Sequence, residues 1–237
     1  MRFSRLAPLL PGLLLAMSCS RSQERPIEDY APQIDPLQFT ASVDNAFFPL
    51  TPGTTLVYEK ADGSERVEFH VLNQVRNVMD VPCRVVKSLE YEDGELVEET
   101  FDWYAQDAEG NVWYFGEDTR TFENGAMTGG EGSWEAGVDG AQPGIIMKAR
   151  PAIGDSYRQE YYAGHAEDMG EVVALADSVT VPYGSFSGML VTRDWTPLEP
   201  GVEERKYYAP GLGLVLEVEG SSRMELVRVE TGASDMD

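Results

Sequence analysis

The segment "VEETFDWYA" (residues 97–105) returns in the other half of the chain as "VEERKYYA" (residues 202–209). In the first segment apolar and polar side chains alternate, which is typical of a β-strand because successive side chains of a strand point to opposite faces of the sheet. One face would carry Val97, Glu99, Phe101, Trp103 and Ala105, and we expect it to be the core face. The other face would carry Leu96, Glu98, Thr100, Asp102 and Tyr104.

The similarity extends upstream and downstream of these two segments. Aligning Glu99 with Glu203 places "WYA" (103–105) on "YYA" (207–209), and a glycine-containing turn with an apolar strand follows each. Upstream, "VPC" (81–83) corresponds to "VPY" (181–183), and Gly53 corresponds to Gly154. Landmarks repeated in the same order predict two homologous halves of about five strands each, over residues 50–120 and 150–230.

The rest of the chain also indicates β-structure. Short runs of β-branched and aromatic residues are separated by turn signals, and Asp93-Gly94 between two alternating runs predicts a hairpin. No long stretch holds a helical period with caps. We therefore predict an all-β fold, an antiparallel barrel, half-barrel or sandwich, with residues 41–237 forming one domain.

The N-terminus carries an export signal. Residues 1–18 combine Arg2 and Arg5 with an apolar stretch that is too short to span a bilayer. The ending "LAMSC" resembles the bacterial lipoprotein signal, in which the cysteine, here Cys19, carries the lipid; ordinary cleavage is the alternative. Residues 19–40 would then form a proline-containing, lipid-anchored tether. Cys83, the second of two cysteines, would be a small buried apolar residue.

The chain is strongly acidic, with 41 Asp and Glu against 18 Lys and Arg and a formal charge of −23. Such a surface repels phosphate backbones and anionic lipid headgroups, so we expect no nucleic-acid partner and no membrane contact beyond the anchor. The charge serves either solubility or the attraction of cations.

Residues 121–148 are rich in glycine and separate the two halves. A connection of this length is unusual inside a domain, where most are about 4–6 residues, and it is typically functional or disordered. Trp134, Val138 and the run 145–147 are apolar enough to pack, so we expect an ordered loop folded across the sheet.

Catalytic signatures are missing from the sequence. His70 and His165 lack the spacing of a zinc site, and no nucleophile elbow or phosphate-binding glycine loop is present. We expect no metal and no cofactor, with calcium at the acidic groups as an alternative that "DAEGN" (107–111) resembles only superficially. Two carboxylates with aromatic rings could also perform glycoside hydrolysis.

We predict a binding module rather than an enzyme, with no catalytic residues. The ligand would be a lipid or other apolar or aromatic small molecule, or else an envelope protein would be the partner, and Tyr104, Trp113, Tyr114 and Trp134 would surround the ligand. The alternatives are a carboxylate-based glycoside hydrolase and a structural envelope protein without a small ligand.

Four segments resemble an uncharacterised family of secreted bacterial proteins that are often lipoproteins. They are "VDNAFFPLTPGTTLVYE" (43–59), "DGELVEETFDWYAQDAEGNVWYFGE" (93–117), "EGSWEAGVDGAQPGIIM" (131–147) and "KYYAPGLGLVLEVE" (206–219). The resemblance implies an extracytoplasmic bacterial setting, in the periplasm or at the cell surface, and brings no established activity. A looser analogy links the expected fold to the half-barrel carriers of lipoprotein acyl chains.

Overall fold

A computed structural model of the chain describes residues 30–232, apart from the side chains of residues 176 and 177. The signal segment and Cys19 lie outside the described residues. One 3₁₀ turn, η1 (Pro36–Gln38), precedes the strands. The strands are β1 (Phe39–Thr40), β2 (Val43–Asn45), β3 (Phe48–Leu50), β4 (Thr54–Lys60), β5 (Glu65–Val78), β6 (Val81–Glu92), β7 (Glu95–Asp107), β8 (Val112–Glu123), β9 (Ala126–Gly129), β10 (Trp134–Glu135), β11 (Gln142–Met147), β12 (Ser156–Arg158), β13 (Glu160–Tyr161), β14 (Met169–Val181), β15 (Gly184–Trp195), β16 (Glu203–Ala209), β17 (Gly213–Glu219) and β18 (Ser222–Thr231).

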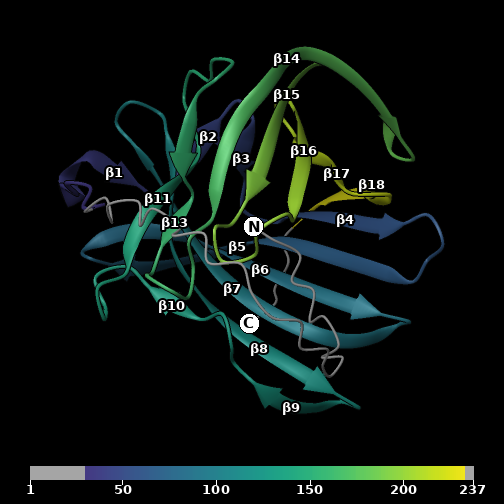
Figure 1. Cartoon of the computed structure of the whole chain (residues 1–237), viewed down its shortest axis with the longest axis horizontal. Helices are drawn as coiled ribbons and strands as arrows, with labels where there is room; N and C mark the ends of the chain where they lie inside the picture. The colour runs from purple at the N-terminus through teal and green to yellow at the C-terminus, as the bar shows by residue number, and fades with distance from the viewer. Residues whose placement is uncertain (1–29, 233–237) are drawn as a thin grey trace, which may run out of the picture. The chain divides into compact units, whose positions relative to one another are not determined.

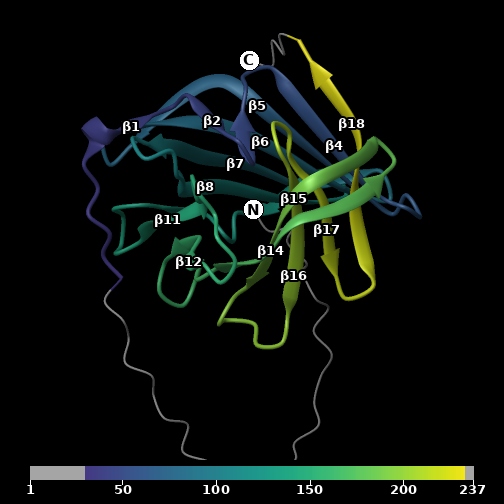
Figure 2. The ribbon, with the colours of Figure 1, turned by 90° about the horizontal axis from the view of Figure 1, so that it is seen from above.

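Thirteen strands form one antiparallel sheet that curls into a nearly closed barrel, in the order β12-β14-β15-β16-β17-β18-β4-β5-β6-β7-β8-β11-β13. Figure 1 shows β4–β8 and β14–β18 as two continuous groups, and Figure 2 shows the sheet curling from one group to the other. The strands at the two ends of the order, β12 and β13, are separated in the chain by Gln159 alone. This confirms the all-β class, and the barrel among the predicted architectures.

The two groups of strands contain the segments that are similar to each other in sequence. Gly53 and Gly154 both have positive φ, and each donates its backbone N–H at 2.8 Å, to the carbonyls of Val71 and Val172 respectively. Glycine suits both positions because L side chains rarely adopt this φ. The common origin of the halves remains a prediction.

The strands β2 and β3 form a hairpin that is hydrogen-bonded to two parts of the barrel. The Gln106 side chain on β7 accepts hydrogen bonds from the backbone N–H groups of Asp44 and Asn45. On the other side of the hairpin, the Gly211 N–H donates to the Ala46 carbonyl at 2.7 Å. The hairpin therefore connects β7 with the turn between β16 and β17.

The glycine-rich segment is ordered and extends along β8 rather than across the sheet. Its three short strands β9, β10 and β11 all pair with β8 in antiparallel register. Trp134, Ile146 and Met147 are buried as expected, whereas Val138 is 48% exposed. The glycines interrupt the pairing but do not prevent it.

The strand β7 is buried on both faces over residues 102–105, which differs from our expectation of one core face. Trp103 and Ala105 are buried as expected, and the Arg76 guanidinium lies 3.8 Å from the Trp103 ring centroid. The opposite face lines the enclosed side of the curled sheet, which we call the interior, and three of its side chains are buried as well: Thr100, Asp102 and Tyr104. The barrel therefore encloses a polar face.

Residues 36–40, which we expected in the tether, are part of the folded domain. Pro36 begins η1, whose N-cap Asp35 accepts a hydrogen bond from the Leu37 N–H. The strand β1 pairs with β7, and Phe39 packs edge-on against Phe115 with ring centroids 5.5 Å apart. The contacts of the half-buried Phe39 ring and the pairing with β7 hold this segment.

Candidate functional site

Three of the four aromatic residues predicted to bind a ligand lie together in the interior. The rings of Tyr104 and Tyr114 are stacked with centroids 4.9 Å apart, and Trp134 packs edge-on against Tyr114 at 5.4 Å. Pairing of β7 and β10 with β8 brings them together, since Tyr104 lies opposite Tyr114 and Trp134 opposite Glu117. We call Tyr104, Tyr114 and Trp134 the aromatic group.

Trp113, the fourth predicted residue, does not join this group. It precedes Tyr114 on β8 and therefore points to the outer face. There it packs against Phe39 at 6.0 Å and donates its indole N–H to Asp107 at 2.8 Å. Trp113 thus supports the strand β1 and the hairpin turn after β7.

The aromatic group lies against carboxyl groups. The Tyr114 hydroxyl is 2.7 Å from Asp102 Oδ1 and 2.6 Å from Glu117 Oε2, so these two carboxyl oxygens are no more than 5.3 Å apart. Asp102 also accepts a hydrogen bond from Ser88 at 3.3 Å and is 2% exposed. We call Asp102, Tyr114 and Glu117 the Tyr114 cluster.

The Tyr114 cluster has fewer hydrogen-bond donors than its two carboxyl groups need when both are ionised. A phenol has a single O–H to donate, so it can satisfy only one of two ionised carboxylates at a time. Burial, followed by repulsion from Asp102, raises the pKa of Glu117 well above its ordinary value, and burial raises the pKa of Asp102. One carboxyl of the pair therefore holds a proton unless another cation or donor reaches it.

Glu160 on β13 adds a further carboxyl near this cluster. Burial, then repulsion from Asp168, raises the pKa of Glu160 to about 8, and Asp102 contributes in the same direction. The strand β13 is placed here by its pairing with β11, and Gly144 on β11 permits that approach: a Cβ at this position would lie 2.4 Å from the Gln159 carbonyl oxygen.

The second group of interior charges surrounds Lys206 on β16. Its ammonium group is 3.3 Å from Asp194, 3.3 Å from Glu204 and 3.8 Å from Glu217, and all four side chains are at most 8% exposed. Burial opposes the charge of Lys206, but the three carboxylates outweigh it and hold its pKa well above the ordinary value. We call these four residues the Lys206 cluster.

Three carboxyl groups around one ammonium leave negative charge uncompensated. Burial raises the pKa of Glu217 to about 8, opposed by Lys206 and assisted by Glu204. Both clusters act on Glu90 on β6, because its pKa, raised mainly by burial and Glu98, is also raised by Glu217 and Asp102. The interior is thus one acidic environment.

Several buried polar atoms of the interior have no hydrogen-bond partner among the described residues: Tyr104 Oη, Trp134 Nε1, Thr192 Oγ1, Asp194 Oδ1 and Glu217 Oε2. Tyr104 is fully buried and Trp134 is 5% exposed. The Tyr104 hydroxyl lowers the pKa of Asp102 and the Trp134 indole lowers that of Glu160, so both donors face the carboxyls without reaching hydrogen-bond geometry. Buried polar atoms in folded proteins are nearly always satisfied, so these atoms need a partner.

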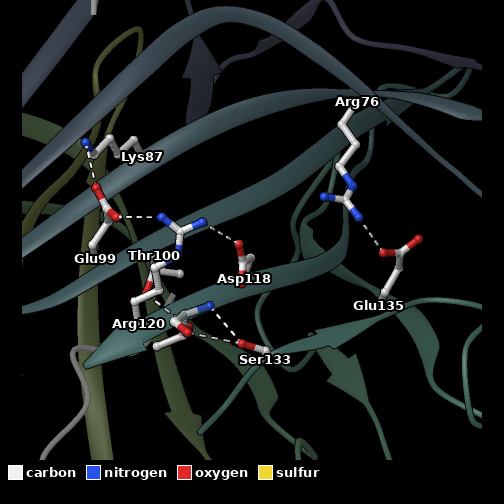
Figure 3. A network of polar contacts seen from close by, with 9 residues as sticks. Arg76, Lys87, Glu99, Thr100, Asp118, Arg120, Ser133 and Glu135 are labelled. Carbon is white, nitrogen blue, oxygen red and sulfur yellow. Dashed lines mark hydrogen bonds and ion pairs between the residues drawn. The ribbon is translucent and has the colours of Figure 1, made fainter. Parts of the chain in front are cut away.

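The outer face of the same strands is organised differently. Figure 3 shows Glu99 between Lys87 and Arg120, and Arg120 beside Asp118. The Glu99 carboxylate is 2.8 Å from the Lys87 ammonium and 3.1 Å from the Arg120 guanidinium. The same figure shows Arg76 pairing with Glu135 of the glycine-rich segment at 2.6 Å. The outer acids Glu99, Asp118 and Glu135 are therefore matched by cations, whereas the interior acids mostly are not.

The segment that resembles a calcium loop and the buried Cys83 both have contacts typical of structural residues. Asp107, in the segment that resembles a calcium loop, accepts hydrogen bonds from Glu109, Asn111 and Trp113 within a hairpin turn. Residues 30–232 contain no group of three or more His, Cys, Asp or Glu side chains that could hold a metal ion. Cys83 is buried, which raises the pKa of its thiol to about 12.

Sequence reasoning missed the Lys206 cluster. The signal was present in "EERKYYA", where Glu204 and Lys206 share a strand face with Tyr208, the counterpart of Tyr104 in the alignment of the halves. Asp194 and Glu217 lie opposite Glu204 and Lys206 on the two neighbouring strands, and only the register of β15, β16 and β17 shows this.

Within residues 30–232, no helix has the length and the apolar character needed to cross a membrane. The chain matches no family model and no curated protein. A crystal structure from Parabacteroides distasonis, provisionally described as a lipoprotein, is similar to this chain with a TM-score of 0.42 and 14% sequence identity, over 78% of this chain and 99% of that one.

Proposed function

We propose that this protein is an extracytoplasmic bacterial lipoprotein, anchored through Cys19, whose barrel binds a small molecule in its interior. The ligand carries an aromatic or apolar part that packs against the aromatic group. The protein acts as a binding module, and an envelope protein is the alternative partner.

The observation that carries this proposal is a set of buried interior polar atoms that have no hydrogen-bond partner among the described residues, two of which, Tyr104 Oη and Trp134 Nε1, belong to the aromatic group. Leaving such an atom unsatisfied costs about 1–3 kcal/mol. Five of them in one interior are expensive for a purely structural core, and a ligand or ordered water would satisfy them. Tyr104 and Trp134, which combine an apolar ring with an unpartnered donor, suit recognition of a ligand that is partly aromatic and partly polar.

Glycoside hydrolysis is the enzymatic alternative, and the Tyr114 cluster bears on it. Asp102 and Glu117 are close enough for a retaining mechanism, which needs carboxyls about 5–5.5 Å apart. However, the Tyr114 hydroxyl lies between them, and Asp102 is almost fully buried. A sugar would have to displace Tyr114 to reach both groups, so the geometry favours binding.

Binding is tested with the neutral fluorescent probe N-phenyl-1-naphthylamine. We expect saturable fluorescence enhancement with the full chain, and at least a fivefold weaker affinity for Tyr104→Phe, which removes only the unpartnered hydroxyl. The free energy of unfolding should stay within about 1 kcal/mol of wild type, because the Tyr104 hydroxyl has no hydrogen-bond partner among the described residues.

Tyr58→Phe is the matched control for this variant. The Tyr58 hydroxyl is also buried, but it donates to the Leu214 carbonyl at 3.0 Å. Tyr58→Phe should therefore lower stability by about 1 kcal/mol and leave probe affinity unchanged. Trp134→Ala is unsuitable for this purpose, since deleting a buried indole also destabilises the fold. No enhancement with wild type, or equal affinity for both variants, would refute binding at the aromatic group.

The anchor is tested separately by mass spectrometry of protein extracted from bacterial membranes. We expect the wild-type chain to begin at Cys19 and to carry the added mass of acyl chains. Cys19→Ala should give a lipid-free protein in the soluble envelope fraction, because a chain without lipid has no hydrophobic attachment. A wild-type product cleaved elsewhere and free of lipid would contradict the anchor without affecting the binding proposal.

A further inference from the structure

The acidic interior defines the ligand more closely, and this step rests on the proposed function. Eight carboxyl groups belong to the two interior clusters or lie near them: Glu90, Glu98, Asp102, Glu117, Glu160, Asp194, Glu204 and Glu217. Within residues 30–232, only Lys206 forms ion pairs with any of them. Arg84, a second buried cation near Tyr104, instead donates to the backbone carbonyls of Ala41, Leu72 and Gln74.

The arrangement of the strands makes this acidity costly. Glu90 and Glu98 lie directly opposite each other on β6 and β7, and Asp102 and Glu117 do so on β7 and β8. Like charges directly opposite on neighbouring strands destabilise a sheet. The outer face of these strands avoids such pairs by placing Lys87 and Arg120 around Glu99. The barrel therefore keeps on its interior face an acidity that it neutralises on the outer face.

Two of the unpartnered atoms are themselves acceptors. Asp194 uses Oδ2 for Lys206 and Gln159, whereas its Oδ1 has no hydrogen-bond partner. Glu217 Oε2 lies 3.8 Å from the Lys206 ammonium, too far for a hydrogen bond. A buried carboxylate oxygen without a hydrogen bond would be stabilised by an N–H or O–H donor. In the Tyr114 cluster the missing partner is likewise a hydrogen, because one phenol faces two carboxyls.

From these observations we infer that the interior binds an organic ammonium group, held by Asp102 and Glu117 and flanked by the rings of the aromatic group. A primary ammonium has three hydrogens and a positive charge, whereas the Tyr114 hydroxyl offers Asp102 and Glu117 a single hydrogen between them. Tyr and Trp faces attract such a cation further when it is desolvated. A metal ion fits less well, because the described residues form no cluster that could hold one.

The test compares two probes of nearly equal shape, 1-naphthylmethylamine and the neutral 1-naphthalenemethanol, by titration calorimetry with the full chain at pH 8. We expect the amine to bind at least tenfold more tightly than the alcohol. Asp102→Asn and Glu117→Gln should each reduce that preference to below threefold, because the amine loses an ionised partner that the neutral alcohol does not need.

Glu99→Gln is the matched control, because Glu99 belongs to the same strand as Asp102 but faces outward between Lys87 and Arg120. It should retain the full preference for the amine. Circular dichroism of all three variants establishes that they are folded.

The possible outcomes separate the two proposals. If both probes bind equally, the ammonium inference is wrong and the binding function stands. If neither probe binds, both proposals fail. If calcium chloride alone binds and Asp102→Asn abolishes its binding, the interior is a metal site and the inference is overturned.

Discussion

Replacing Lys206 by methionine is expected to lower the free energy of unfolding by about 3–5 kcal/mol at pH 8, the cost typical of removing one partner from a buried ion pair. The Lys206 side chain is 3% exposed and neutralises Asp194, Glu204 and Glu217 at once. Methionine keeps much of the apolar stem but removes the ammonium group that lies against three buried carboxyl groups. Urea denaturation with an unchanged m-value measures the loss.

The control is Arg228→Met, which removes a surface ion pair. Arg228 lies 2.7 Å from Glu230, and both side chains are more than half exposed. Exposed pairs of this kind contribute about 0–1 kcal/mol, so the control should be nearly neutral. The loss in Lys206→Met should shrink as the pH falls toward 5, since Glu217, whose pKa burial raises to about 8, then binds a proton. A loss as small as that of Arg228→Met, independent of pH, would mean that Lys206 does not compensate these acids.

The fold could be predicted because its signals are local. Alternation in residues 97–105, the Asp93-Gly94 turn and the matching positions of Gly53 and Gly154 each reflect a strand or turn requirement that a short segment fulfils by itself. Whether the strands form a barrel or a sandwich depends on the pairing of β18 with β4 and on Gln159, which joins the two end strands β12 and β13. No short segment encodes these long-range arrangements.

The candidate site could be predicted only in part. Tyr104, Tyr114 and Trp134 were found because large aromatic residues concentrate in interiors, and Trp113 was included wrongly in the same group because composition does not give the face. On β7, polarity alone suggested that Asp102 would face outward. It lies inside, because the curl of the sheet encloses that face, and the other face is covered by Arg76 and the strand β1.

Stability is expected to fall as the pH rises from 5 to 8, opposite to the behaviour of most carboxyl groups in proteins. The pKa values of Glu160 and Glu217 are raised to about 8 in the folded chain, mainly by burial. Between the ordinary pKa of glutamate, about 4.3, and 8, the folded state therefore binds more protons than the unfolded state. Unfolding becomes more favourable as the pH rises through this range.

Glu217→Gln should remove a large part of this pH dependence. Glutamine resembles the protonated acid and cannot ionise, so the variant should match wild type near pH 5 and be more stable at pH 8 by on the order of 3 kcal/mol. The groups that face Glu217 are Lys206, Glu204 and Asp194, and Glu90 is near enough to be affected by it. The lowered pKa of His70, caused mainly by burial, acts in the opposite direction, but only below about pH 6.5.

The measurement is urea denaturation at half-unit steps from pH 5 to 8, with Glu95→Gln as the control. Glu95 is exposed at the start of β7, so its replacement should leave the slope of stability against pH as in wild type. The same pH series of urea denaturation also tests the inference that the interior binds an ammonium group. Added 1-naphthylmethylamine should stabilise wild type more at pH 8 than at pH 6, because ionised interior carboxyls bind the cation while protonated ones do not. A wild-type stability that is constant or rises over this range would show that the interior acids are ionised and satisfied without a ligand.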